Sequence, residues 1–277
     1  MKFLALIILL QPVLLFGQQD WQASSPEDKP SHYILTYSSV DGNAASLKEI
    51  SNFIKKLERK ETQKKSTEFI RHLFLKTHQE FLRHYTEYAS FSETLDKGKY
   101  NCLTGTALYA LLLDHFDIEY KIIETNYHIF LLASTKGGQI LFEATDPSNG
   151  FVEKPKDIDS RINLYKQNRV QETNIDKKYY RYNFNLYNQV SLDQIEGLLH
   201  YNLSIAAFNE QNLHASIQRL DRALDLYNSP RMLEFSTILL LSVMESKLDN
   251  VDKENCIKNI QAIRKKQVQV MASRNSD

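Results

Sequence analysis

This sequence of 277 residues predicts an α+β fold in which helices pack on a small antiparallel sheet, followed by an all-helical segment. Three observations support the prediction. Apolar residues recur at three- and four-residue steps before residue 90 and after residue 195, which is the spacing of amphipathic helices. Three short runs rich in β-branched and aromatic residues lie between these stretches. Only 8 Gly and 6 Pro stand against 15 Tyr and 14 Phe, which disfavours a turn-dense all-β sandwich.

The composition is that of a globular protein without a strong charge. Hydrophobic residues make up 42% of the chain and charged residues 25%, so the chain is long enough and apolar enough to bury a core. Its 34 Lys and Arg residues balance 34 Asp and Glu residues. Because zero net charge provides no long-range attraction for a polyanion, we expect no nucleic-acid partner.

The N-terminus has the pattern of a secretory signal. Lys2 precedes an apolar run over residues 3–16, and polar residues follow from Gly17 onward. The run is shorter than the roughly 20 apolar residues of a transmembrane helix and is interrupted by Pro12, which favours a cleaved signal peptide over residues 1–17. We therefore expect an exported chain, periplasmic or secreted, that contacts a membrane only if the signal stays uncleaved.

Two helices are expected before the sheet. Residues 45–60 and 67–88 repeat their apolar side chains with the period of an amphipathic helix. The polar segment that precedes them contains one short apolar run at residues 33–37, which suggests a strand or an ordered arm.

The middle of the chain predicts the sheet itself. An apolar helix over residues 102–116 leads into three strands at residues 119–124, 128–133 and 139–144. Lys136-Gly137-Gly138 forms the hairpin turn between the last two strands. A helix followed by consecutive short strands is typical of an α+β fold with an antiparallel sheet.

The rest of the chain is expected to cover the sheet and then to turn helical. Residues 151–187 are charged and rich in Tyr without a clear period, which predicts a long loop over the sheet. Residues 198–209 and 213–226 form two amphipathic helices, and residues 233–248 begin another.

Three residues could carry thiol chemistry, which needs a nucleophile, a base within hydrogen-bond reach and a group that orients the base. Cys102 opens a helix, where unpaired N–H groups and the helix dipole favour a thiolate. His128 heads a strand, and Asp146 follows the end of the next strand. In an antiparallel pair these two strand ends lie side by side, so we expect Asp146 beside the His128 ring, where it would fix the tautomer.

Three motifs in chain order resemble the core of the transglutaminase-like superfamily. They are residues 98–109, GKYNCLTGTALY, residues 126–131, NYHIFL, and residues 143–150, EATDPSNG. The resemblance covers roughly residues 69–151. It is closest to the bacterial branch in which tetratricopeptide-type helices follow the core, here at about residues 195–226.

The resemblance implies a papain-like α+β fold with a Cys-His-Asp triad, and we expect no cofactor or metal. Cys102 would be the nucleophile, His128 the general base and acid, and Asp146 the orienting carboxylate. The generic candidate for the oxyanion hole is the backbone N–H of Cys102. The expected organisation after the signal is a transglutaminase-like domain at residues 18–187 and a tetratricopeptide-like helical region at residues 188–277.

The C-terminal helices resemble a tetratricopeptide repeat in their distribution of side-chain size. Small residues at Ser204, Ser216 and Ala223 and large residues at Leu203 and Leu220 fit close helix packing. The alternative is an ordinary helical hairpin docked on the first domain. Either arrangement offers packing or binding surface, because no acid, base and nucleophile converge in it.

Other roles for Cys102 are open. A disulfide with Cys256 is natural in an exported chain with two cysteines and would remove the nucleophile. A zinc ion held by Cys102, His128, Asp146 and a water molecule is a further alternative.

The expected function is that of an exported cysteine-dependent amide-bond hydrolase or acyltransferase acting on a peptide or protein. The alternative is a non-catalytic transglutaminase-like scaffold with a tetratricopeptide-like protein-binding surface.

Overall fold

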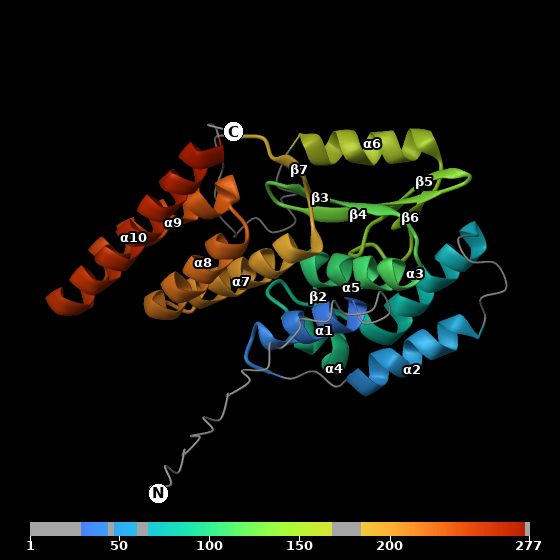
Figure 1. The fold of residues 1–277 in the computed structure, drawn as a ribbon, viewed down its shortest axis with the longest axis horizontal. Helices are drawn as coiled ribbons and strands as arrows, with labels where there is room; N and C mark the ends of the chain where they lie inside the picture. Colours follow the sequence, from blue (N-terminus) through green and yellow to red (C-terminus); the bar gives the residue numbers. More distant parts are fainter. Residues whose placement is uncertain (1–28, 44–46, 60–65, 168–183, 275–277) are drawn as a thin grey trace, which may run out of the picture.

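The computed structural model describes residues 29–43, 47–59, 66–167 and 184–274. The signal peptide predicted at residues 1–17 lies outside the described residues. The described part of the chain forms ten helices and seven strands in a mixed α/β fold (Figure 1). Within it, no helix is long and apolar enough to span a lipid bilayer.

Helices occupy both ends of the described part of the chain, and most of the strands lie between them. The elements are α1 Lys29–Ser39, α2 Leu47–Glu58, α3 Thr67–Phe81, β1 His84–Tyr85, α4 Phe91–Lys97, β2 Lys99–Tyr100, α5 Cys102–His115, β3 Tyr120–Thr125, β4 Ile129–Thr135, β5 Gly138–Phe142, β6 Phe151–Val152, α6 Pro155–Lys166, β7 Tyr187–Val190, α7 Leu192–Asn209, α8 Leu213–Leu226, α9 Pro230–Glu245 and α10 Asn250–Arg274.

Five strands form one antiparallel sheet in the order β6-β5-β4-β3-β7. Figure 1 shows α5 against one face of this sheet and α6 against the other. The short strands β1 and β2 form a separate parallel pair. The expected helix, the three strands and their hairpin are thus confirmed as α5, β3, β4 and β5, and the small antiparallel sheet is confirmed with them.

Helix α5 lies at the centre of the molecule. Every residue from Leu103 to Leu113 is buried, because the helix is enclosed by the sheet on one side and by other helices on the other. Successive strand residues alternate between the two faces of the sheet. Ile122 therefore packs toward α5, whereas Ile123 joins the smaller cluster under α6.

The two helices expected before the sheet are confirmed as α2 and α3, but α3 is shorter than predicted. It ends at Phe81 instead of residue 88. The chain then forms β1 and a further helix, α4, which begins with Ser90 as its N-cap. These extra elements bring the chain back to the start of α5.

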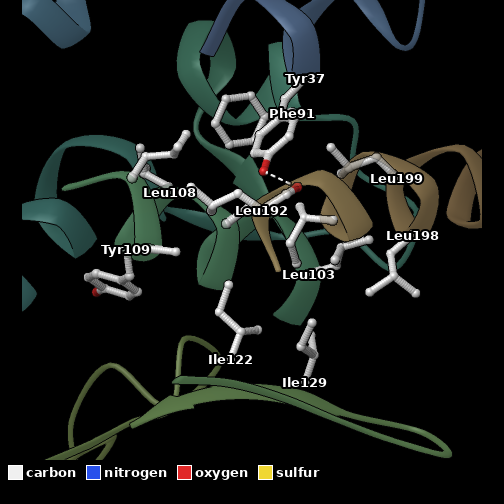
Figure 2. Packing of buried hydrophobic residues seen from close by; sticks show 14 of the residues in the cluster. Tyr37, Phe91, Leu103, Leu108, Tyr109, Ile122, Ile129, Leu192, Leu198 and Leu199 are labelled. Carbon is white, nitrogen blue, oxygen red and sulfur yellow. Dashed lines mark hydrogen bonds between the residues drawn. The ribbon is translucent and has the colours of Figure 1, made fainter. Parts of the chain in front are cut away.

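Residues 33–37 are helical, so the prediction of a strand or ordered arm there is wrong. Ile34 and Tyr37, three residues apart in α1, are buried. The Tyr37 hydroxyl donates a hydrogen bond of 2.6 Å to the carbonyl of Leu192, and its ring packs edge-on against Phe91 (Figure 2). A short apolar run fits a strand or a helix equally well, and here packing against α7 decides.

The predicted long loop over the sheet is also wrong in part, because it contains α6. Pro155 occupies the first turn of this helix, where its missing N–H is harmless. Ile158, Ile162 and Tyr165 lie on one side of the helix and pack on the sheet. Residues 168–183 of the predicted loop lie outside the described residues.

The three predicted C-terminal helices are confirmed as α7, α8 and α9. Between α7 and α8, the Ser204 hydroxyl donates to the Ser216 carbonyl at 2.7 Å, and the Ser216 hydroxyl donates to the Ser204 carbonyl at 2.9 Å. Small side chains permit this close approach. One hydrophobic cluster extends from Ile34 in α1 to Ile263 in α10, so these helices pack on the core. The predicted boundary after residue 187 falls within β7.

Candidate active site

Cys102 and His128 lie at the ends of two elements that pack together. Cys102 is the first residue of α5, and its side chain is half-buried. Asn101 caps the helix, since its side chain accepts from the Thr104 N–H at 2.9 Å while its backbone N–H donates to the Thr104 hydroxyl at 3.1 Å. The cap fixes α5 to begin at Cys102. His128 is the residue before β4.

Gly105 brings the first turn of α5 close to the end of β5. A Cβ atom at Gly105 would lie 2.7 Å from the Cβ of Ala144, which is closer than side-chain atoms approach one another. Ala144 is the second residue after β5. The missing side chain at Gly105 therefore lets Cys102 lie near the residues that follow this strand.

The carboxylate that contacts the His128 ring is Glu143. The Nε2 atom of His128 lies 2.5 Å from the Oε2 atom of Glu143. The prediction that Asp146 lies beside the ring is wrong: the Asp146 carboxylate accepts from Arg161 at 2.9 Å and from the Asn149 N–H at 2.9 Å.

Strand register explains why Glu143 is the partner. In the antiparallel pair of β4 and β5, Leu131 lies opposite Phe142. One residue further along the pair, Phe130 therefore lies opposite Glu143. Because alternate residues share a face, His128 lies on the Phe130 face and so does Glu143. The His128 ring is accordingly stacked at 6.3 Å from the ring of Phe130.

Four hydrogen bonds hold the Glu143 carboxylate. Its Oε2 atom contacts His128 Nε2 and accepts from the Tyr165 hydroxyl at 2.6 Å. Its Oε1 atom accepts from the Thr145 N–H at 3.0 Å and from the Thr145 hydroxyl at 2.6 Å. Burial raises the pKa of Glu143, but the His128 charge and these hydrogen bonds outweigh burial and lower the pKa. Glu143 is therefore a buried carboxylate in its ionised form.

The same interactions favour the protonated form of His128. Burial lowers the pKa of His128, but the Glu143 charge, hydrogen bonds with Cys102 and Glu143 and the Cys102 charge together raise it well above its ordinary value. The side chains of Cys102, His128 and Glu143 thus form a continuous series, with the histidine ring in the middle.

Tyr165 of α6 closes the side of the site away from α5. Its ring centroid lies 4.9 Å from that of His128 and 4.9 Å from that of Phe130. Burial and the Glu143 charge raise the pKa of the Tyr165 hydroxyl, so it remains a hydrogen-bond donor to Glu143. Tyr165 therefore holds both the ring and the carboxylate.

Asp146 organises the turn that follows Glu143. The Gly150 N–H donates to the Asp146 carbonyl at 2.7 Å, and the Glu143 N–H donates to the Gly150 carbonyl at 2.8 Å. A Cβ atom at Gly150 would lie 2.2 Å from the Glu143 carbonyl oxygen, so only glycine fits. Arg161 ties this turn to α6 through Asp146 and the Asn149 carbonyl.

The two cysteines are not joined. Cys102 and Cys256 are free thiols, so the alternative of a disulfide between them is wrong. Cys256 is buried in α10 and its Sγ atom lies 3.6 Å from His214 Nδ1. In the described ranges, no group of three or more His, Cys, Asp or Glu side chains has an arrangement able to hold a metal ion.

The structure places Cys102 at the start of a helix and His128 next to the start of a strand, as the sequence predicts. The sequence alone did not predict the contacts of Glu143, Tyr165 and Thr145. The sequence contains a signal for Glu143. Side chains alternate between the two faces along each predicted strand, and this alternation puts residues 128 and 143 on the same face of the sheet. No comparable signal marks Tyr165, because its place depends on how α6 docks on the sheet.

Comparisons with known proteins give no match: no protein family, no curated protein and no solved structure is significantly similar to this chain.

Proposed function

We propose that this protein is a transglutaminase-like thiol enzyme that cleaves or transfers the acyl group of an amide bond in a peptide or protein. The observation that carries the proposal is the partly buried contact between His128 and Glu143 next to Cys102, the first residue of α5. In the proposed triad Cys102 is the nucleophile, His128 transfers the proton and Glu143 orients the ring.

The charge distribution supports acylation of Cys102 in two steps. The Cys102 thiolate attacks the carbonyl carbon, a C–S bond forms, and the carbonyl electron pair moves to the oxygen. When the tetrahedral intermediate collapses, the C–N bond breaks and the leaving nitrogen takes the proton from the His128 imidazolium. The raised pKa of His128 means that this proton is already in place before the attack.

Deacylation reverses the proton transfer. Neutral His128 removes a proton from water or from an acceptor amine, which attacks the thioester carbonyl. The C–S bond breaks, Cys102 leaves as a thiolate and His128 is again an imidazolium. Water yields hydrolysis and an amine yields acyl transfer. The N–H groups in the first turn of α5 have no helix carbonyl before them, so the Cys102 N–H can donate to the developing oxyanion.

The fold supports a papain-like arrangement. A helix that starts at the cysteine packs on an antiparallel sheet, and the next strands carry the histidine and its carboxylate. We also propose export, on the N-terminal pattern of residues 1–17. Mass spectrometry of the protein from its native host tests export, because a cleaved signal shifts the N-terminus to about residue 18.

Alkylation of Cys102 by iodoacetamide tests the thiol chemistry directly. We expect the wild-type protein to react at pH 6, whereas His128→Ala reacts at least about tenfold more slowly, as an ordinary thiol does when its pKa is about 8.5. The matched control is His115→Ala, since His115 also pairs with a carboxylate, Glu58, at 3.0 Å but lies outside the site. Equal rates in all three proteins would contradict the proposal and favour a non-catalytic scaffold. A peptide-amide substrate screen with Cys102→Ala as the blank then identifies the reaction.

A further inference from the structure

A buried ion pair joins the C-terminal helices to the sheet. Arg231, in the first turn of α9, contacts Glu124 at the end of β3, with 2.5 Å between Nη2 and Oε1. The Glu124 side chain is completely buried, and the Arg231 side chain is 16% exposed. The Tyr227 hydroxyl donates to the other Glu124 oxygen at 2.6 Å. The junction of α8 and α9 is therefore bound to one point of the sheet.

Arg231 also reaches the turn that carries His128. Its Nη1 atom donates to the backbone carbonyl of Asn126 at 3.0 Å, two residues before His128. The guanidinium thus contacts Glu124 with one nitrogen and the Asn126 carbonyl with the other. A planar fork of fixed geometry is suited to such a pair of contacts.

The turn itself is closed by hydrogen bonds between its two ends. The Thr125 N–H donates to the His128 carbonyl at 2.8 Å, and the His128 N–H donates to the Thr125 hydroxyl at 3.1 Å. The Asn126 side chain is held as well, since it accepts from the Leu186 N–H at 2.7 Å. The Asn126 carbonyl and His128 therefore belong to one hydrogen-bonded turn.

We infer that Arg231 is a positioning residue for His128, so that the C-terminal helices are part of the catalytic unit in addition to any binding role. The inference rests on the proposed function of Cys102 and His128. Stability alone is a weak reason for this ion pair, because burying two charges in place of apolar side chains brings little or no net gain. The geometry of the pair has a different consequence. Arg231 holds the Asn126 carbonyl in place, and the turn that contains Asn126 ends at His128, the residue proposed to transfer the proton.

The experiment measures alkylation of Cys102 by iodoacetamide between pH 5 and pH 10 in the full chain, resolved by peptide mass spectrometry. Arg231→Lys keeps the positive charge near Glu124 but lacks the fork that contacts Asn126. We expect labelling at pH 6 to fall about tenfold. At pH 10 we expect it to stay within about twofold of wild type, because thiols in so alkaline a solution are ionised without help from His128. General loosening of the fold would instead speed labelling at every pH.

Arg219→Gln is the matched control. Arg219 also extends from the C-terminal helices to a backbone carbonyl of the core, that of Val40, but away from His128. We expect its labelling profile to match wild type. If Arg231→Lys does not fold, as judged by circular dichroism, the double variant Glu124→Gln with Arg231→Gln decides in its place, because it leaves no unpaired buried charge.

The outcomes separate the two proposals. Slow labelling at pH 6 in Arg231→Lys and His128→Ala, but not in Arg219→Gln, supports the inference. A wild-type profile in Arg231→Lys with slow labelling in His128→Ala overturns the positioning role and leaves the proposed function intact. A wild-type profile in His128→Ala overturns both.

Discussion

The Nε2 atom of His128 lies 2.5 Å from the Oε2 atom of Glu143, across the open ends of the neighbouring strands β4 and β5. Each of the two groups stabilises the charged form of the other inside the protein. Asp146, only three residues beyond Glu143, instead holds the turn through Arg161. Five predictions test this relationship and the packing around it.

The first prediction separates the two carboxylates. Glu143→Gln removes the charge that favours the His128 imidazolium, so we expect kcat on an amide substrate to fall by about a hundredfold or more. Asp146→Asn keeps the acceptor for the Asn149 N–H, and we expect a loss below about threefold. Steady-state kinetics of both variants check this. Equal losses would mean that the turn, and not the charge of Glu143, controls the site.

The second prediction concerns the Tyr165 hydroxyl. Tyr165→Phe keeps the ring beside His128 but removes one hydrogen bond from Glu143, which costs about 1.5–3 kcal/mol for a bond to a charged group. We expect lower stability and slower labelling of Cys102 at pH 6. Tyr109→Phe is the control, because its hydroxyl donates to the Phe74 carbonyl in the core. It should lose stability in urea titrations without changing the labelling rate.

The third prediction tests the close approach of α5 to the sheet. A methyl group at Gly105 would collide with Ala144, so Gly105→Ala should cost about 1–3 kcal/mol of unfolding free energy and slow Cys102 labelling at pH 6. A Cβ atom at Gly137, on the exposed hairpin, would lie 3.7 Å from the Thr135 hydroxyl oxygen, which is an ordinary contact, so Gly137→Ala should stay within about 0.5 kcal/mol. Urea unfolding measures both, and a neutral Gly105→Ala would refute the tight contact.

The fourth prediction concerns the pH dependence of stability. The pKa of His128 is raised in the folded state, so the stability it contributes is fully present below its unfolded value of about 6.5 and is lost as pH rises through its folded value. The pKa of Glu143 is lowered, so its contribution is present above about 4.3 and is lost as pH falls through its folded value.

Thermal unfolding of wild type and His128→Ala from pH 6 to pH 10 isolates the histidine contribution. We expect the difference in Tm between the two proteins to shrink steadily over this range. A difference that stays constant would show that folding does not raise the pKa of His128.

The fifth prediction compares the two thiols. Cys256 is 1% exposed, and burial raises its pKa, so in the native protein iodoacetamide should label it far more slowly than Cys102. In denaturant the two rates should become similar. Peptide-resolved mass spectrometry gives both rates in one sample, and fast native labelling of Cys256 would contradict its burial.

Local patterns predicted much of the fold. The apolar period of residues 47–58 and the alternating strands on either side of Lys136-Gly137-Gly138 depend only on neighbours along the chain. The same patterns did not predict α1 or α6 as helices. The burial of α1 depends on its contact with α7, and only a few apolar residues of α6 face the sheet.

The sequence by itself determined that a helix begins at Cys102 and that a strand begins next to His128, because helix period and strand alternation are local properties. Only the tertiary structure decided which carboxylate meets the histidine and which arginine holds its turn. The Glu143 contact spans 15 residues and the Arg231 contact with Asn126 spans 105, so register and helix docking settle them. The sequence therefore marks His128 as a candidate site residue, but packing between distant segments decides that Glu143 and Arg231 are the residues that contact His128 and its turn.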